Sequence, residues 1–271
     1  MEPSPRTPVS ALTDYEPSPQ MRWGLRDVAI GLGLFVLVVV IANVVGASVP
    51  GLDFNAFQLI TFVVGYGALL ATLIVASRRR GLGTLGADFG FHFRWIDLAI
   101  GLGIGIAAKI ATVFYGALAA LLTGEPATSS NLSLSDDILW ITLNGVLFAG
   151  IIAPIVEELF LRGLLLRVIR NRALRNFSEA DATPSEVQRV KVRAAVLAIG
   201  LSSLVFMVLH LYQSSDPALL ITLALGTLTL GVVNGVVVVV TGRLGAAITA
   251  HIFYNGSSVL LLIALQLAGV M

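Results

Sequence analysis

The chain of 271 residues is strongly apolar: 56% of its residues are hydrophobic, and only 12% are charged. Ordinary soluble domains carry about 25% charged residues, so this composition cannot supply the surface of a water-soluble protein. The net charge of +1 gives no reason to expect a nucleic-acid partner, and the lack of cysteine excludes disulfides, thiol catalysis and cysteine-ligated zinc. We therefore expect an all-α, polytopic transmembrane helix bundle whose main partner is the lipid bilayer.

Apolar runs long enough to cross a bilayer, about 17–25 residues each, occur at seven places along the sequence. In chain order they are predicted at residues 27–48, 56–77, 96–122, 138–166, 194–212, 217–240 and 244–267. Residues 1–26 are rich in proline and are expected to form a flexible cytoplasmic tail. Residues 27–122 are assigned to N-terminal transmembrane helices and residues 138–267 to a catalytic core, and residues 167–193 are predicted to be a loop of mixed charge.

The positively charged residues orient these spans. Fifteen of the 17 Arg and Lys residues lie in the tail and in alternate loops, whereas the loops on the other side contain none. Cytoplasmic loops are enriched in Arg and Lys, so the N-terminus is predicted to be cytoplasmic. We expect a multi-pass protein of the cell membrane with seven spans, because one missed span would break the alternation.

The few ionisable residues inside the predicted spans are the candidates for function. An ionisable side chain at the centre of a bilayer is costly, so it usually faces a protein interior or a wet cavity. These residues are Lys109, Glu157, Glu158, Arg162, His210 and His251.

The fourth span contains two adjacent carboxylates, Glu157 and Glu158, followed by Arg162. Glu158 and Arg162 are four residues apart, so they lie on one face of a helix and can pair. Glu157 points about a quarter of a turn away and is left to act as a general base that activates water. A purely structural salt bridge is the alternative, but it would need only one glutamate.

Two later spans each carry a histidine one helical turn from another notable side chain. Phe206 and His210 in the fifth span, and His251 and Asn255 in the seventh, are four residues apart. Each pair therefore shares a helix face, and its polar groups can stabilise a developing oxyanion or hold a metal ion. Each pair is weak evidence alone, but three polar constellations on three separate spans are much stronger.

Together the motifs E-E-x-x-x-R, F-x-x-x-H and H-x-x-x-N resemble those of the CPBP family, which includes type II CAAX prenyl endopeptidases and bacteriocin-processing or Abi-type membrane proteins. The matching stretches are residues 157–162, 206–210 and 251–255. The resemblance implies an intramembrane protease that depends on a glutamate or on a metal. It further implies that Glu157 and His210 activate water, and that His251 and Asn255 stabilise the oxyanion.

The sequence leaves open whether the reaction uses a metal. Two histidines and the carboxylates can hold one divalent ion such as Zn²⁺ with an open position, as catalytic zinc sites do. The same side chains also support a metal-free mechanism in which Glu157 is the base, and we favour this mechanism slightly.

The position of His210 fits the predicted spans poorly. At about 1.5 Å per residue, Glu157 lies about 15 Å along its helix from Arg167, whereas His210 lies about 25 Å from Arg193. His210 can meet Glu157 only if the fifth span is strongly tilted or if Arg193 lies well outside the bilayer.

The primary prediction is an intramembrane endopeptidase that hydrolyses a peptide bond in a membrane-associated or lipid-modified, CAAX-like substrate. Its nucleophile would be a water activated by a glutamate in a cavity among the helices. One alternative is a catalytically silent membrane partner, such as a bacteriocin-immunity-type protein that binds another membrane protein. Another is a small ion-coupled transporter with the buried carboxylates as proton carriers, although we find no inverted repeat.

Overall fold

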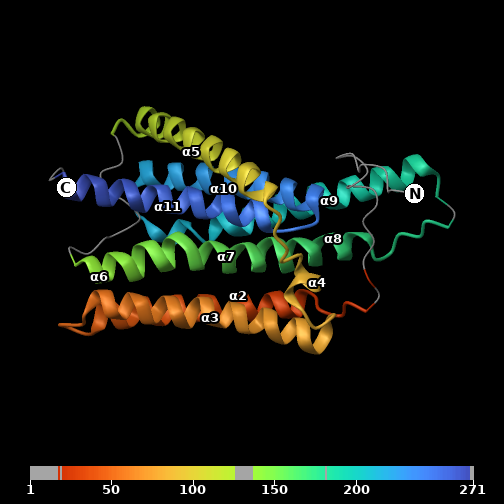
Figure 1. Ribbon diagram of the computed structural model, residues 1–271, viewed down its shortest axis with the longest axis horizontal. Coiled ribbons are helices and arrows are strands. Elements are labelled where there is room, and N and C mark those ends of the chain that lie inside the picture. Colours follow the sequence, from red (N-terminus) through yellow and green to blue (C-terminus); the bar gives the residue numbers. More distant parts are fainter. Residues whose placement is uncertain (1–17, 19, 126–136, 181, 269–271) are drawn as a thin grey trace.

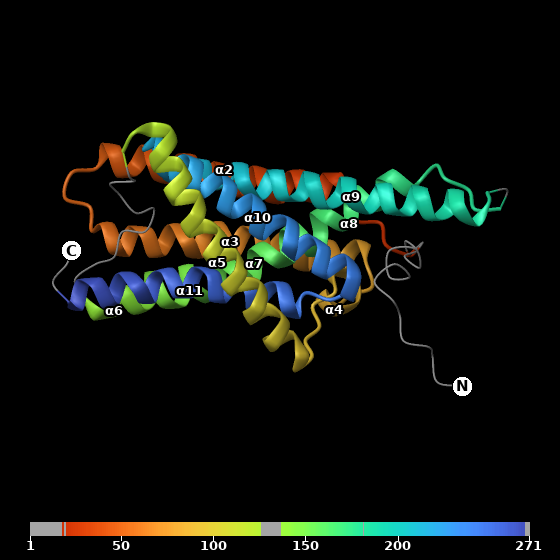
Figure 2. The same cartoon turned by 90° about the horizontal axis from the view of Figure 1, so that it is seen from above.

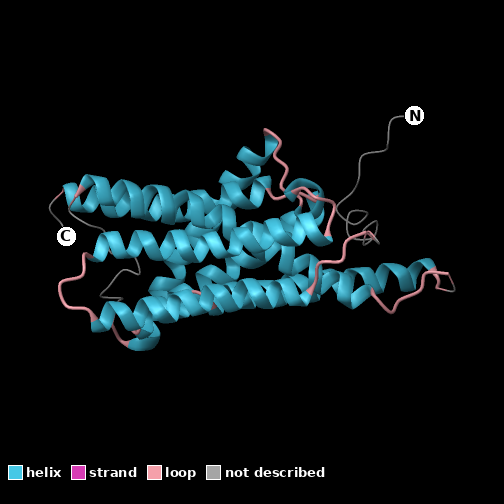
Figure 3. Cartoon of the chain, turned by 90° about the horizontal axis from the view of Figure 1, so that it is seen from below, coloured by secondary structure: helices cyan, strands magenta, loops and turns pink. Residues whose placement is uncertain are grey.

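The computed structural model describes residues 18, 20–125, 137–180 and 182–268, and within these residues the protein is helical, with no strand (Figures 1 and 3). The elements are α2 (Leu25–Ser48), α3 (Phe54–Arg80), α4 (Leu85–Phe89), α5 (Ile96–Thr123), α6 (Ile138–Trp140), η1 (Ile141–Ile152), α7 (Ala153–Glu158), η2 (Leu159–Leu165), α8 (Leu166–Leu174), α9 (Pro184–Val208), η3 (Leu211–Gln213), α10 (Pro217–Thr241) and α11 (Gly245–Leu267).

Seven helical stretches are long and apolar enough to cross a bilayer, which confirms the predicted all-α bundle. They are Leu25–Ser48, Phe54–Arg80, Ile96–Thr123, Ile138–Leu174, Pro184–Gln213, Pro217–Thr241 and Gly245–Leu267. Most of them lie roughly along one axis, whereas α5 crosses its neighbours obliquely (Figure 2). The orientation of the bundle in the membrane stays a prediction from the distribution of Arg and Lys.

The predicted loop over residues 167–193 is wrong, because most of this stretch is helical. α8 continues to Leu174 and α9 begins at Pro184, and the two helices project together beyond the other spans (Figures 1 and 2). Thr183 and Glu186 start α9 with a capping box, in which the Thr183 hydroxyl accepts from Glu186 N (3.3 Å) and Glu186 Oε2 accepts from Thr183 N (2.8 Å). Hydropathy alone misses such a projection, because a helix outside the bilayer needs no continuous apolar surface.

The fourth span changes its winding along its length. η1 and η2 are π-helical, and α7 between them is α-helical and ends with the two glutamates. A π-helix closes its hydrogen bonds over five residues, and such segments are frequent at functional sites. The winding therefore changes between Glu158 and Arg162, the two residues that were predicted to pair.

α5 and α11 approach one another closely through glycines on α5. A Cβ atom at Gly101 would lie 2.6 Å from the Ala246 carbonyl oxygen, and one at Gly105 would lie 2.9 Å from the Ala250 carbonyl oxygen. Since both obstacles are backbone atoms, they cannot move aside as a side chain would. Small residues at membrane helix interfaces permit this approach.

We expect Gly101→Ala to destabilise the protein by about 1–3 kcal/mol, because the new methyl group would push α11 away. Thermal unfolding in detergent measures the effect. Gly103→Ala is the matched control, since no atom lies within 4 Å of a Cβ there. A control variant as unstable as Gly101→Ala would contradict this account of the interface.

Candidate functional site

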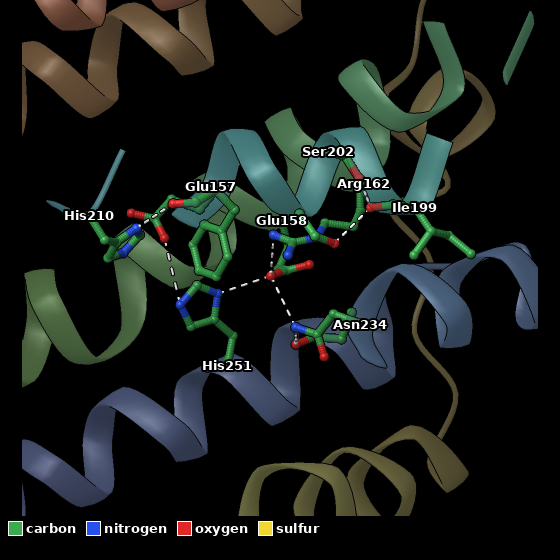
Figure 4. Close-up of polar contacts among 11 residues, drawn as sticks. Glu157, Glu158, Arg162, Ile199, Ser202, His210, Asn234 and His251 are labelled. Atoms are coloured by element: carbon green, nitrogen blue, oxygen red, sulfur yellow. Dashed lines mark hydrogen bonds and ion pairs between the residues drawn. The ribbon is translucent and has the colours of Figure 1, made fainter. Parts of the chain in front are cut away.

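One carboxylate oxygen, Oε1 of Glu158, joins three of the membrane helices. Arg162 Nη1 donates to it at 3.0 Å, and both side chains are 0% exposed, so the contact expected from their spacing is present. Asn234 Nδ2 from α10 donates to the same oxygen at 3.1 Å, and His251 Nδ1 from α11 donates at 3.0 Å (Figure 4). Oε1 of Glu158 therefore accepts from its own helix and from two others, whereas its Oε2 accepts no hydrogen bond from the described residues.

Glu157 lies in different surroundings from its neighbour. Tyr66 on α3 donates its hydroxyl to Glu157 Oε1 at 2.7 Å. The other oxygen, Oε2, is buried, lies 3.6 Å from His251 Nε2 and accepts no hydrogen bond from the described residues. Because an unsatisfied buried carboxylate oxygen is costly, this atom is suited to receive a further donor such as water.

His210 lies just beyond the end of α9 and is held through Phe206. Its Nδ1 donates to the Phe206 carbonyl oxygen at 2.8 Å, and the two rings meet edge to face with centroids 4.5 Å apart. The Phe206 ring also meets the His251 ring, at 5.3 Å. In neutral His210 the engaged Nδ1 leaves Nε2 as a hydrogen-bond acceptor.

Glu157 and His210 line the same cavity, so the structure brings these two predicted residues together. Its lining residues come from α2, α3, the fourth span and the end of the fifth: Leu32, Phe35, Tyr66, Leu69, Glu157, Phe160, Leu161, Phe206, Leu209, His210, Tyr212 and Gln213. About 20 Å³ is open to the centre of a water molecule, which is room for one water.

The projection of α8 and α9 explains how His210 reaches this depth. Arg193 is ten residues into α9 and therefore does not mark the point where the apolar part of that helix begins. The sequence allowed two explanations, a strong tilt of the fifth span or a position of Arg193 well outside the bilayer. The structure favours the second, because the charged beginning of α9 extends past the other spans (Figure 2).

Asn255 contacts the fourth span at another point. Its Nδ2 donates to the Ala149 carbonyl oxygen at 3.0 Å, and the residue is not part of the cavity lining. This hydrogen bond links α11 to η1. The oxyanion role that the family resemblance implies for Asn255 stays a prediction.

Sequence reasoning missed two polar residues of this site, Tyr66 and Asn234. Asn234 could have been found, because it is a single amide in a run of valine and glycine. Tyr66 carries no comparable signal, since it lies 91 residues before Glu157 and only the folded helices bring the two together.

The described residues do not fit a bound metal ion as they are arranged. No group of three or more His, Asp or Glu side chains among them is placed to hold one. The two ring nitrogens of His251 face Glu158 and Glu157, and Glu158 is already engaged by Arg162. We therefore derive no catalytic step through a metal.

Comparison with known protein families gives a match over residues 139–257, to the family described as type II CAAX prenyl endopeptidase Rce1-like. No curated protein and no solved structure matches the chain. The family match contains all three motifs and confirms the resemblance drawn from them. It leaves out α2, α3 and α5, and with them Tyr66.

We expect Arg162→Met to destabilise the protein by about 3–5 kcal/mol, because it leaves the buried carboxylate of Glu158 without its cation. The double variant Glu158→Gln with Arg162→Met removes both charges and should recover more than half of that loss. Chemical unfolding in detergent compares the two variants with the wild type. Equal losses in both would show that the charge of Glu158 is not the cause.

Proposed function

From the match of residues 139–257 to the Rce1-like type II CAAX prenyl endopeptidases, we propose that this protein is an intramembrane endopeptidase. Its substrate is a membrane-associated or lipid-modified protein with a CAAX-like end. The observation that carries the proposal is the buried, unpaired Glu157 Oε2, which lies with His210 at a cavity large enough for one water.

In the proposed reaction the water donates hydrogen bonds to Glu157 Oε2 and to Nε2 of His210. Glu157 takes one proton from the water, and the water oxygen attacks the carbonyl carbon of the scissile peptide bond. The proton then passes to the amide nitrogen as the carbon–nitrogen bond breaks, which yields a carboxylic acid and an amine. The acid then gives its remaining proton to the amine, so the products are a carboxylate and an ammonium group. His251 Nε2 lies 3.6 Å from Glu157 Oε2 and can donate to the oxyanion of the intermediate when both nitrogens of its ring carry a proton.

Glu158 and Arg162 have a positioning role in this proposal. Their ion pair is completely buried and holds His251 through its Nδ1, so the other ring nitrogen faces Glu157. Fixing one nitrogen of a histidine sets the orientation and the tautomer of the other. Glu158 is thus adjacent to the base Glu157 in sequence, but it influences the base through His251 on α11.

The isosteric variant Glu157→Gln is expected to abolish cleavage, because an amide cannot accept the proton of the water. Purified wild type and variant are compared on fluorogenic prenylated and unprenylated peptides, each with and without a chelator. Glu125→Gln, at an exposed position after α5, is the matched control and should cleave normally. We expect the chelator to leave the rate unchanged.

Full activity in Glu157→Gln would overturn the assignment of the base. If instead Glu157→Gln complements a deletion strain as well as the wild type does, the non-enzymatic membrane partner is the better description. Cleavage that stops with the chelator and returns with Zn²⁺ would contradict the metal-free mechanism while leaving the protease assignment intact.

Removing the Tyr66 hydroxyl should slow the reaction without weakening substrate binding. We expect Tyr66→Phe to lower kcat about tenfold with KM unchanged, since a hydrogen bond to a charged group contributes about 1.5–3 kcal/mol. Tyr115→Phe is the control, because that hydroxyl contacts Thr229 (2.9 Å) rather than Glu157. A change in KM alone would place Tyr66 in substrate binding instead.

A further inference from the structure

A second and larger cavity lies at the arginine-rich end of the bundle, between the N-terminal segment and the projecting α8 and α9. Its volume is about 760 Å³, within the range of small-molecule sites. It is lined by Ser18, Met21, Arg22, Trp23, Gly24, Leu25, Val168, Asn171, Arg172, Leu174, Arg175, Phe177, Glu179 and Lys191. None of these residues belongs to the site described above.

The cavity carries an excess of positive charge. Its single acidic residue, Glu179, is already engaged by Lys191 at 2.8 Å. No carboxylate of the described residues pairs with Arg22, Arg172 or Arg175. Three guanidinium groups around one cavity repel one another, and an anion bound among them would relieve that repulsion.

The N-terminal wall of the cavity is fixed in place by contacts with α3 and α4. Trp23 is 5% exposed, and its Nε1 donates to Asp88 Oδ1 at 2.9 Å. Its ring packs on Phe89 with centroids 5.4 Å apart, and the backbone N–H of Arg22 donates to the Arg80 carbonyl oxygen at 2.6 Å. Arg22 is therefore presented from a well-anchored segment.

We propose that this cavity binds the phosphate headgroup of an anionic phospholipid from the surrounding leaflet. Guanidinium groups match phosphate oxygens in geometry as well as in charge. The cavity also continues onto a lipid-facing surface, because Leu25 belongs both to its lining and to α2, where Ile30, Leu34 and Leu37 are exposed. A free phosphate would use only the arginines, whereas a phospholipid uses the apolar helix as well.

Native mass spectrometry of the full chain in detergent, with equal amounts of phosphatidylglycerol and phosphatidylcholine, tests the proposal. The wild type should retain phosphatidylglycerol preferentially. The double variant Arg172→Gln with Arg175→Gln should weaken its retention about thirtyfold, at about 1 kcal/mol for each arginine near a membrane surface. The control is Arg78→Gln with Arg79→Gln, two exposed arginines at the end of α3 outside the cavity, which should retain the lipid as the wild type does.

Thermal unfolding in phosphatidylcholine alone checks that the three proteins are equally folded. Equal retention of the two lipids by the wild type, or unchanged retention by the cavity variant, would overturn the proposal. Displacement of the lipid by inorganic phosphate at the same concentration would also overturn it, since the site would then recognise a soluble anion. None of these three results depends on whether the protein is a protease.

Discussion

The buried charge of Glu158 is the constraint on which the membrane core depends. An ionised carboxylate cannot be left alone among apolar helices, and here three side chains offset its cost by donating to the Oε1 atom of Glu158. Arg162 comes from the same helix, but Asn234 and His251 come from α10 and α11, so satisfying the charge also fixes how the last helices pack on the fourth. Each glutamate keeps one buried oxygen without a hydrogen bond from the described residues, but only Glu157 lines the cavity.

Much of this arrangement follows from the sequence, for reasons that are local. The seven apolar runs and the alternating positive loops predict the spans, because each span must cross the same thickness of hydrocarbon. The spacing of Glu158 and Arg162 predicts their contact because one helical turn separates them. The π-helical segments, the projecting α8 and α9, and the contact of Tyr66 with Glu157 depend on tertiary packing. No local sequence pattern predicts these three features.

The site is built from two parts of the chain, and only one of them lies in the region that matches a known family. The matched region, residues 139–257, contains both glutamates and the three polar motifs. One wall of the cavity, however, comes from α2 and α3, with Leu32, Phe35 and Tyr66 facing the base. Features of the cavity that depend on this wall therefore belong to the part of the chain that the family comparison does not cover.

The alternating winding of the fourth span has a consequence for how its length can change during evolution. Each π-helical turn holds one residue more than an α-helical turn, so η1 can lose a residue by rewinding as α-helix while both of its ends keep their places. Residues 159–162 also lie in a π-helical segment, η2, but here the contact of Arg162 with Glu158 fixes the number of residues between the two side chains. A residue gained or lost there would rotate the guanidinium away from the carboxylate, so length variation is tolerated on one side of the glutamates and forbidden on the other.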